Sequence, residues 1–206
     1  EFDTDNGFSG KVQYCLSVRD PRLADTSRSN GFESDNCADG ATVEPYTTAT
    51  FSNVTFVGPI GQDADFKNDD SYINGGEVYP NNGSSLGKFQ AAMHIRRSSR
   101  LSCFNSVAIG WSIGLILDSE KGNTQTMATK GSLKLQNLWF ADMDMLGADC
   151  NKATMDALYD YATKTYDETK NSFSHDFFLA QKGNKQCKSS DLGLTMPNSK
   201  VGAAYM

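Results

Sequence analysis

Four acidic residues near the start of the chain have the types and spacing of a cation site. Asp3 and Asp5 alternate ahead of Gly7, as the first ligands of a calcium loop do. Tyr14 occupies the position where an EF-hand carries its last glutamate, so this is not an EF-hand. A second acidic corner further along would lie beside the first if successive turns of the chain stack, and a bound Ca²⁺ would relieve the resulting repulsion. The metal ligands suggested by the sequence are Asp3, Asp5, Glu33 and Asp35, and ordinary solvated turn carboxylates are the alternative.

Two further groups of charged residues could support cleavage of a polysaccharide. Arg96, Arg97 and Arg100 offer a basic residue to remove the proton beside a uronate. Asp63 and Asp65 begin an acidic cluster that could supply the paired carboxylates of a hydrolase. That cluster lies in a stretch rich in Gly and Asn, which is a poor platform for fixed geometry. The sequence therefore assigns no catalytic residue.

Aromatic side chains near turns could bind a glycan by stacking on sugar rings. Tyr72 and Tyr79 lie in a long segment with little apolar pattern, and Trp111 follows Gly110 at another turn. We predict Tyr72, Tyr79 and Trp111 as ligand-binding residues. The alternative is that these rings only cover apolar surface.

The cysteines indicate disulfide chemistry rather than metal binding. Five are present without any Cys-x-x-Cys spacing, and the chain has only two histidines, which argues against a structural zinc site. Cys150 and Cys187 bracket the last irregular segment, and we predict a disulfide between them. Cys103 follows the apolar pattern of a buried thiol, whereas Cys15 and Cys37 could pair or remain free.

The elements that position these groups are indicated by a recurring phrase. Asn53, Asn105 and Asn137 each follow an apolar or thiol residue by two positions and precede an apolar run that ends at Gly or Asp. Such repetition is typical of a solenoid. We predict that the three asparagines form a ladder at one corner, with side chains turned inward to bond buried backbone groups. The alternative is three unrelated asparagines at turns, which Asn favours.

The spacing of apolar residues predicts stacked coils of about 20–22 residues. Period-2 alternation over Val12–Val18 and Met93–Leu117, with polar turns between, indicates short strands without intervening helices. The fold predicted is all-β, a right-handed parallel β-helix with three short strands per coil and a C-terminal α-helical appendage. A long insertion near 60–89 and a shorter one at 121–130 account for the longer spacings.

The end of the chain differs from the coils. Apolar residues at helical spacing in 151–170 predict an amphipathic helix with Asn151 as its N-cap. We therefore divide the chain into the coils of 1–149 and a helix-containing segment, 150–206, that packs on the solenoid. Both ends look cut from an open solenoid, so we expect a fragment of a longer chain.

Composition limits the classes of partner. The net charge is -6 and the sequence pI is about 4.9, which disfavours binding to nucleic acid. No apolar stretch is long enough to cross a membrane, so we expect no membrane insertion.

Several phrases resemble those of a known class of protein. Residues 2–13, 29–36 and 51–59 are similar to secreted right-handed parallel β-helix repeat proteins of Bacteroidetes, which belong to the broad pectate-lyase-like class and have no assigned function. The resemblance covers 1–118 well and the C-terminal segment poorly. It implies secretion or an outer cell surface location.

This resemblance leaves two classes of function open. The first is a structural, adhesive or glycan-binding role, with polysaccharide or other surface proteins as partners and Ca²⁺ as the one candidate cofactor. The alternative is a polysaccharide lyase or glycoside hydrolase, because the same fold carries enzymes as well as stalks.

Overall fold

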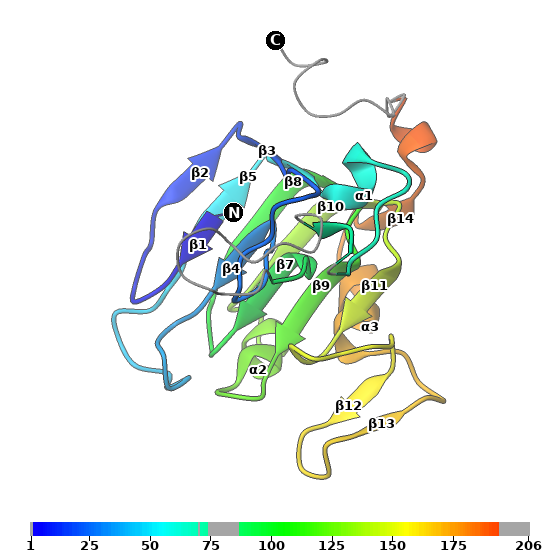
Figure 1. Ribbon diagram of the computed structural model, residues 1–206. Helices are drawn as coiled ribbons and strands as arrows, with labels where there is room; N and C mark the ends of the chain where they lie inside the picture. Colours follow the sequence, from blue (N-terminus) through cyan, green and yellow to red (C-terminus); the bar gives the residue numbers. More distant parts are fainter. Residues whose placement is uncertain (1, 70, 74–86, 194–206) are drawn as a thin grey trace, which may run out of the picture.

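The computed structural model describes residues 2–69, 71–73 and 87–193, and it confirms the predicted parallel β-helix (Figure 1). One wall of the solenoid is a five-stranded parallel sheet, here called sheet A. In spatial order its strands are β1 (Phe2–Thr4), β4 (Phe32–Ser34), β7 (Ala91–Arg96), β9 (Ile113–Asp118) and β11 (Met145–Ala148).

The facing wall, sheet B, is also parallel and supplies the other two strand segments of each coil. Its main path, in spatial order, is β2 (Lys11–Gln13), β5 (Thr50–Ser52), β8 (Ser102–Ile109), β10 (Leu135–Ala141) and β14 (Lys185–Cys187). Beside it, β3 (Leu16–Val18) pairs with β6 (Thr55–Val57), which pairs with the second half of β8. Strands β8 and β10 therefore each contain two segments joined at a bend.

Asparagine recurs at this bend because the backbone there is left-handed. Asn53, Asn105 and Asn137 have φ of 54°, 50° and 55°. Asn tolerates this region better than other non-glycine residues. Tyr14 (φ 56°) occupies the bend of the first coil, and Gly183 (φ 75°) lies against Asn137 in the last. The bend therefore requires a left-handed backbone conformation, and Asn is one of several residue types that adopt it there.

The asparagine side chains point outward, so the predicted inward orientation is wrong. All three are exposed. Asn137 Nδ2 donates to Asn105 Oδ1 at 3.0 Å, while Asn53 Nδ2 donates to the neighbouring Ser52 Oγ at 3.1 Å. The backbone N–H of the buried residue after the bend finds a partner other than the bend asparagine. For example, Ser106 Oγ accepts the backbone N–H of Val54 at 3.0 Å.

The core lies between the two sheets and is built from inward side chains at matching positions. Met93 pairs with Leu115 and Ile95 with Leu117, in agreement with the predicted coil length, and all four are fully buried. At the N-terminal end of the solenoid an aromatic cluster fills the core, with the rings of Phe32 and Phe51 stacked at 5.0 Å. Stacking of like residues on successive coils gives one continuous core.

Two helical segments lie between strands of successive coils. Helix α1 (Pro59–Gln62) follows β6 and opens the segment predicted as the long insertion. Helix α2 (Thr124–Thr129) lies between β9 and β10, within the predicted excursion at 121–130. Phe66 from the described part of the long segment packs edge-on against Phe89 at 5.7 Å.

The predicted helix over 151–170 is wrong. This stretch contains an antiparallel hairpin of β12 (Leu158–Asp160) and β13 (Thr165–Asp167). The Asp160 carboxylate accepts the backbone N–H groups of Ala162 and Thr163, and Lys164 adopts a φ of 59°, so local polar bonds stabilise a tight turn. The rings of Tyr159 and Tyr166 then meet across the hairpin at a tilted angle, with centroids 5.0 Å apart, a contact that the helical periodicity did not indicate.

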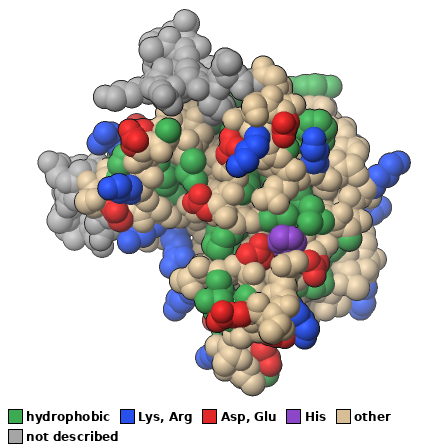
Figure 2. Space-filling model, turned by 90° about the vertical axis from the view of Figure 1, so that its right-hand side faces the viewer, with side chains coloured by type: hydrophobic (Ala, Val, Ile, Leu, Met, Phe, Trp, Pro, Cys, Tyr) green, Lys and Arg blue, Asp and Glu red, His purple; other side chains and the backbone are tan. Residues whose placement is uncertain are grey.

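A helix does follow this hairpin and covers the end of the core. Helix α3 (Phe173–Ala180) places Phe178 on Phe140 with ring centroids 4.2 Å apart. The buried Asp149 carboxylate accepts the N–H groups of Phe173 and Ser174, at 2.9 and 3.0 Å, at the start of the helix. The chain continues into β14 and a short 3-10 helix, η2 (Ser189–Leu192). Figure 2 looks onto this side and shows charged side chains of both signs spread among hydrophobic ones.

Within the described part of the chain, no helix is long and apolar enough to cross a membrane.

Candidate functional site

Charged side chains gather on the outer face of sheet A, toward the carboxyl ends of its strands. Glu33 of β4 lies opposite His94 of β7. Two positions further on, Arg96 lies opposite Asp118 of β9. Side chains alternate between the two faces of a strand, so these residues share the side that the core does not occupy. We call Glu33, Asp35, His94, Arg96, Arg97 and Asp118 the sheet A cluster.

Within this cluster the arginines are paired with carboxylates of the preceding coil. Arg96 Nε donates to Asp35 Oδ1 at 2.7 Å, and its Nη2 donates to Glu33 Oε1. Arg97 Nη1 donates to Asp35 Oδ2 at 2.6 Å. Burial raises the pKa of Glu33, against the opposing influence of His94 and Arg96. The paired guanidinium groups are therefore held in fixed positions.

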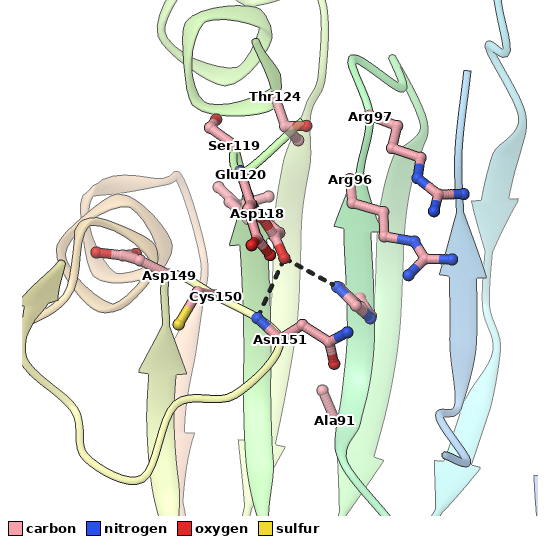
Figure 3. Close-up of polar contacts among 12 residues, drawn as sticks. Ala91, Arg96, Arg97, Asp118, Ser119, Glu120, Thr124, Asp149, Cys150 and Asn151 are labelled. Atoms are coloured by element: carbon pink, nitrogen blue, oxygen red, sulfur yellow. Dashed lines mark hydrogen bonds and ion pairs between the residues drawn. The ribbon is translucent and has the colours of Figure 1, made fainter. Parts of the chain in front are cut away.

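Asp118 is held from two sides. Its Oδ1 accepts the N–H of Glu120 at 2.6 Å. Its Oδ2 accepts the N–H of Asn151 (Figure 3), at 3.1 Å. Asn151 belongs to residues 150–154, which follow β11 and cross the outer face of sheet A; we call them the crossing segment. The Asn151 carbonyl accepts Gln90 Nε2 and Arg28 Nη1, each at 2.6 Å. Asn151 therefore ties this segment down, instead of capping a helix as predicted.

A cavity of about 200 Å³ opens between the sheet A cluster and the crossing segment. It combines fixed acceptors and donors, and its lining residues are Arg96, Arg97, Asp118, Glu120, Lys121 and Asn151. Carboxylates accept hydrogen bonds, guanidinium and ammonium groups donate them, and an amide side chain does both. Such a mixture suits a ligand whose own groups both donate and accept, as hydroxyl groups do.

His94 lies beneath this cavity, between carboxylates of two other coils. Its side chain is only 1% exposed. Nδ1 is 3.7 Å from Glu33 Oε2 and Nε2 is 3.8 Å from Asp118 Oδ2. Neither ring nitrogen has a hydrogen-bond partner among the described residues. His94 therefore lies within ion-pair distance of both acids without a hydrogen bond to either.

The four residues predicted to bind a metal do lie on adjacent coils, with Asp3 opposite Glu33. The Asp3 carboxyl is exposed, and its pKa is raised by partial burial and by the neighbouring Asp5 and Asp35. Glu33 and Asp35 have guanidinium partners where the sequence suggested a cation. In the described ranges, no group of three or more Asp, Glu, His or Cys side chains could hold a metal ion.

Two of the three aromatic residues predicted to bind ligand lie in the described part of the chain, and each already has a partner within the protein. Trp111 is fully buried and donates from Nε1 to the carbonyl of Phe56 at 3.2 Å, so its prediction as a ligand-binding residue is wrong. Tyr72 is half-buried, donates to Asp63 and lies under Arg22, whose guanidinium is 5.0 Å from the ring. Burial and the Asp63 bond raise the pKa of Tyr72 to about 12. Tyr79 lies outside the described residues.

The predicted disulfide is also wrong, because all five cysteines are free thiols. Cys150 follows β11 of sheet A and its Sγ lies 3.3 Å from the hydroxyl of Tyr166. Cys187 ends β14 of sheet B, on the other wall of the solenoid. Cys103 is fully buried, as predicted, and burial raises its pKa to about 12.

Sequence reasoning missed five members of the site: His94, Asp118, Glu120, Lys121 and Asn151. For Asp118 a signal was present, because Gly114–Asp118 repeats the pattern of Gly31–Asp35 and both phrases end at the same corner. His94 could have been found by aligning the coil that contains Met93–Arg96 with the two phrases Gly31–Asp35 and Gly114–Asp118. No local signal identified Asn151, whose role depends on where the chain goes after β11.

Comparison with known proteins identifies the architecture. A family model described as a pectate-lyase like beta helix domain matches residues 1–178. No curated protein and no solved structure matches the chain.

Proposed function

This chain belongs to the pectate-lyase-like β-helix domain family, and from that premise we propose that it binds carbohydrate on the outer face of sheet A. The site is the cavity between the sheet A cluster and the crossing segment. The observation that carries the proposal is its lining, which combines the carboxylates of Asp118 and Glu120 with the cations Arg96, Arg97 and Lys121. A sugar hydroxyl can donate to a carboxylate and accept from a neighbouring cation at the same time.

The rigidity of the lining supports binding. Arg96 is fixed by Glu33 and Asp35, and Asp118 is fixed by two backbone N–H groups. Groups that are already ordered lose little conformational entropy when a ligand arrives. Strands also hold side chains more precisely than loops do. A flat structural stalk would not need this arrangement of paired charges around a hollow.

A glycan ligand agrees with a location outside the cell. We propose that the protein is secreted or displayed on an outer cell surface, with polysaccharide or other surface proteins as its partners. An adhesive or structural role for the whole solenoid is compatible with such a site.

The direct test is binding of neutral oligosaccharides to Glu120→Gln, compared with the unmodified protein. Glu120 is exposed and lines the cavity. A charge-assisted hydrogen bond contributes about 1.5–3 kcal/mol, so we expect affinity to fall at least about tenfold. The matched control is Glu168→Gln, which removes an exposed glutamate beyond β13 and should leave affinity unchanged. Titration calorimetry after a glycan screen gives both values. If the two variants weaken binding equally, or no glycan binds, the proposal fails.

One observation favours a second candidate, cleavage of the bound polysaccharide. Asp118 and Glu120 line the same cavity, and hydrolases use two carboxylates on either side of the bond that breaks. The assay is release of reducing ends, together with the ultraviolet absorbance of an unsaturated product that a lyase would form. Activity that disappears in both Asp118→Asn and Glu120→Gln would establish this candidate. Glycan binding without products leaves the binding role.

A further inference from the structure

A second cavity, of about 480 Å³, lies on sheet A at the opposite ends of its strands. Gln90, Ile113 and Met145 line it from the starts of β7, β9 and β11. Residues 152–154 of the crossing segment form another side, and Asn151 of the same segment lines the first cavity. The crossing segment therefore separates two hollows along one face.

The second cavity differs from the first in charge. Arg28, Lys88 and Lys152 line it, and its described lining contains no Asp or Glu. The first cavity contains both signs. The chain as a whole carries a net charge of -6, so a hollow with cations alone does not reflect the average composition. The local potential favours a negatively charged group.

Arg28 has a backbone conformation that non-glycine residues rarely adopt, with φ at 86°. Its Nη1 donates to the carbonyl of Asn151 at 2.6 Å, which places the guanidinium between the loop before β4 and the crossing segment. A guanidinium carries five N–H donors, so this bond leaves donor capacity on a fixed group. Lys152 is exposed on the crossing segment itself.

We propose that this cavity binds a tetrahedral oxyanion, a sulfate or phosphate ester carried by the glycan. This deepens the proposed function, because it assigns a substituent to the same ligand. Two of the cations, Arg28 and Lys152, come from separate segments: the loop before β4 and the crossing segment. They can reach oxygens that point in different directions. A tetrahedral group presents oxygens in several directions, which suits donors on separate segments, whereas a planar carboxylate presents its two oxygens in one plane.

The remaining lining suits the sugar that carries the ester. Phe89, Ile113, Met145 and Ala153 provide apolar surface in the same hollow. Ligand sites usually combine such surface with a few polar groups, and their volumes are on the order of 300–1,000 Å³. The cavity therefore has room for a sugar ring beside the anion.

The test uses inorganic sulfate, inorganic phosphate and acetate at constant ionic strength, with the protein labelled at its lysine side chains. We expect sulfate or phosphate to shift the NMR signal of Lys152, and acetate to have little effect. Lys152→Gln should weaken the binding of the tetrahedral anion about tenfold, as loss of a charged partner predicts. The matched control, Lys134→Gln, removes an exposed lysine just before β10 of sheet B and should not change affinity.

A second arm compares dextran sulfate oligosaccharides, dextran phosphate oligosaccharides and the unmodified parent. Preference for either ester over the parent, lost in Lys152→Gln, supports the proposal and identifies the ester. Equal weakening by Lys152→Gln and Lys134→Gln would show general attraction to charge and overturn it. Acetate binding as tightly as sulfate and phosphate would overturn the tetrahedral assignment. Neutral glycans and Glu120→Gln test the first cavity separately, so the two proposals can fail independently.

Discussion

Two columns of polar residues run across the coils, and they differ in what repeats. At the bend of sheet B, Asn53, Asn105 and Asn137 repeat one residue type, and their side chains are exposed. On sheet A, matching positions carry different residues with complementary charge, as where Asp118 lies opposite Arg96. Repetition of one residue satisfies a backbone requirement that every coil shares. Complementary residues at matching positions satisfy one another and form a local site.

Arg96→Ala should lower the free energy of unfolding more than the other changes considered below, because Arg96 pairs with both Glu33 and Asp35 on sheet A. The substitution leaves Glu33 and Asp35 partly buried without their main partner. Full loss of a buried partner costs about 3–5 kcal/mol. These side chains keep some exposure to water, so we expect a loss of about 2–3 kcal/mol in the free energy of unfolding. Urea denaturation measures this loss, with Lys134→Ala as control. A loss under about 0.5 kcal/mol, typical of surface sites, would contradict the comparison.

Asn105→Ala should destabilise the protein less than Arg96→Ala. Comparing it with Asn105→Gly separates the contribution of the left-handed backbone from that of the side-chain hydrogen bond. Alanine in the left-handed region costs about 1–2 kcal/mol, and we expect destabilisation of this size. Asn105→Gly adopts a positive φ without strain, so it should retain most of the stability. Thermal and urea unfolding of both variants provide the comparison. If glycine destabilises as much as alanine, the bond from Asn137 to Asn105 matters more than the bend.

The pH dependence of stability should report on Glu33. Its pKa is raised in the folded protein, chiefly by burial, so the folded state holds this proton more tightly than the unfolded chain does. Stability from this group is therefore lost as pH rises from 4.5, the ordinary pKa of a glutamate carboxyl, through the raised pKa of the folded state. Glu33→Gln should show a smaller decline over that window than the unmodified protein. Identical slopes for both proteins would exclude a contribution from Glu33.

Calcium should have the smallest effect of all. Arg96 and Arg97 already offset the charge of Glu33 and Asp35. We expect neither millimolar Ca²⁺ nor excess chelator to move the melting temperature beyond experimental error, since only binding to the folded state would raise it. A clear rise with Ca²⁺ would restore the cation site first suggested by Asp3 and Asp5.

The success of sequence reasoning differed between the same two columns. The asparagine phrase and the period-2 alternation predicted a parallel β-helix, which the fold and the family confirm. The orientation of the asparagines was predicted wrongly, because recurrence alone does not distinguish a left-handed bend from an inward amide. The arginines beside Glu33 and Asp35 were treated as a separate basic cluster, although they lie one coil away from these acids.

Errors concentrated where local signals compete. Tyr159 and Tyr166 fit a helical period, yet the turn that Asp160 stabilises forms a hairpin. Cys150 and Cys187 bracket one segment in sequence but lie on opposite walls of the solenoid. Trp111 follows a glycine at a predicted turn, which suggested an exposed ring. Instead it is buried, because Phe66 from the described part of the insertion packs on Phe89, and Phe89 packs on Trp111.

By itself the sequence determined the coils, because alternation of apolar residues with polar turns is a local property that each coil carries in full. Only the tertiary structure decided which residues meet on sheet A, because the neighbours there are one coil apart in space and separated in sequence by insertions of unequal length. Asn151 shows the limit most clearly. Its bonds to Asp118, Gln90 and Arg28 depend on a crossing over the sheet that nothing in its own neighbourhood specifies.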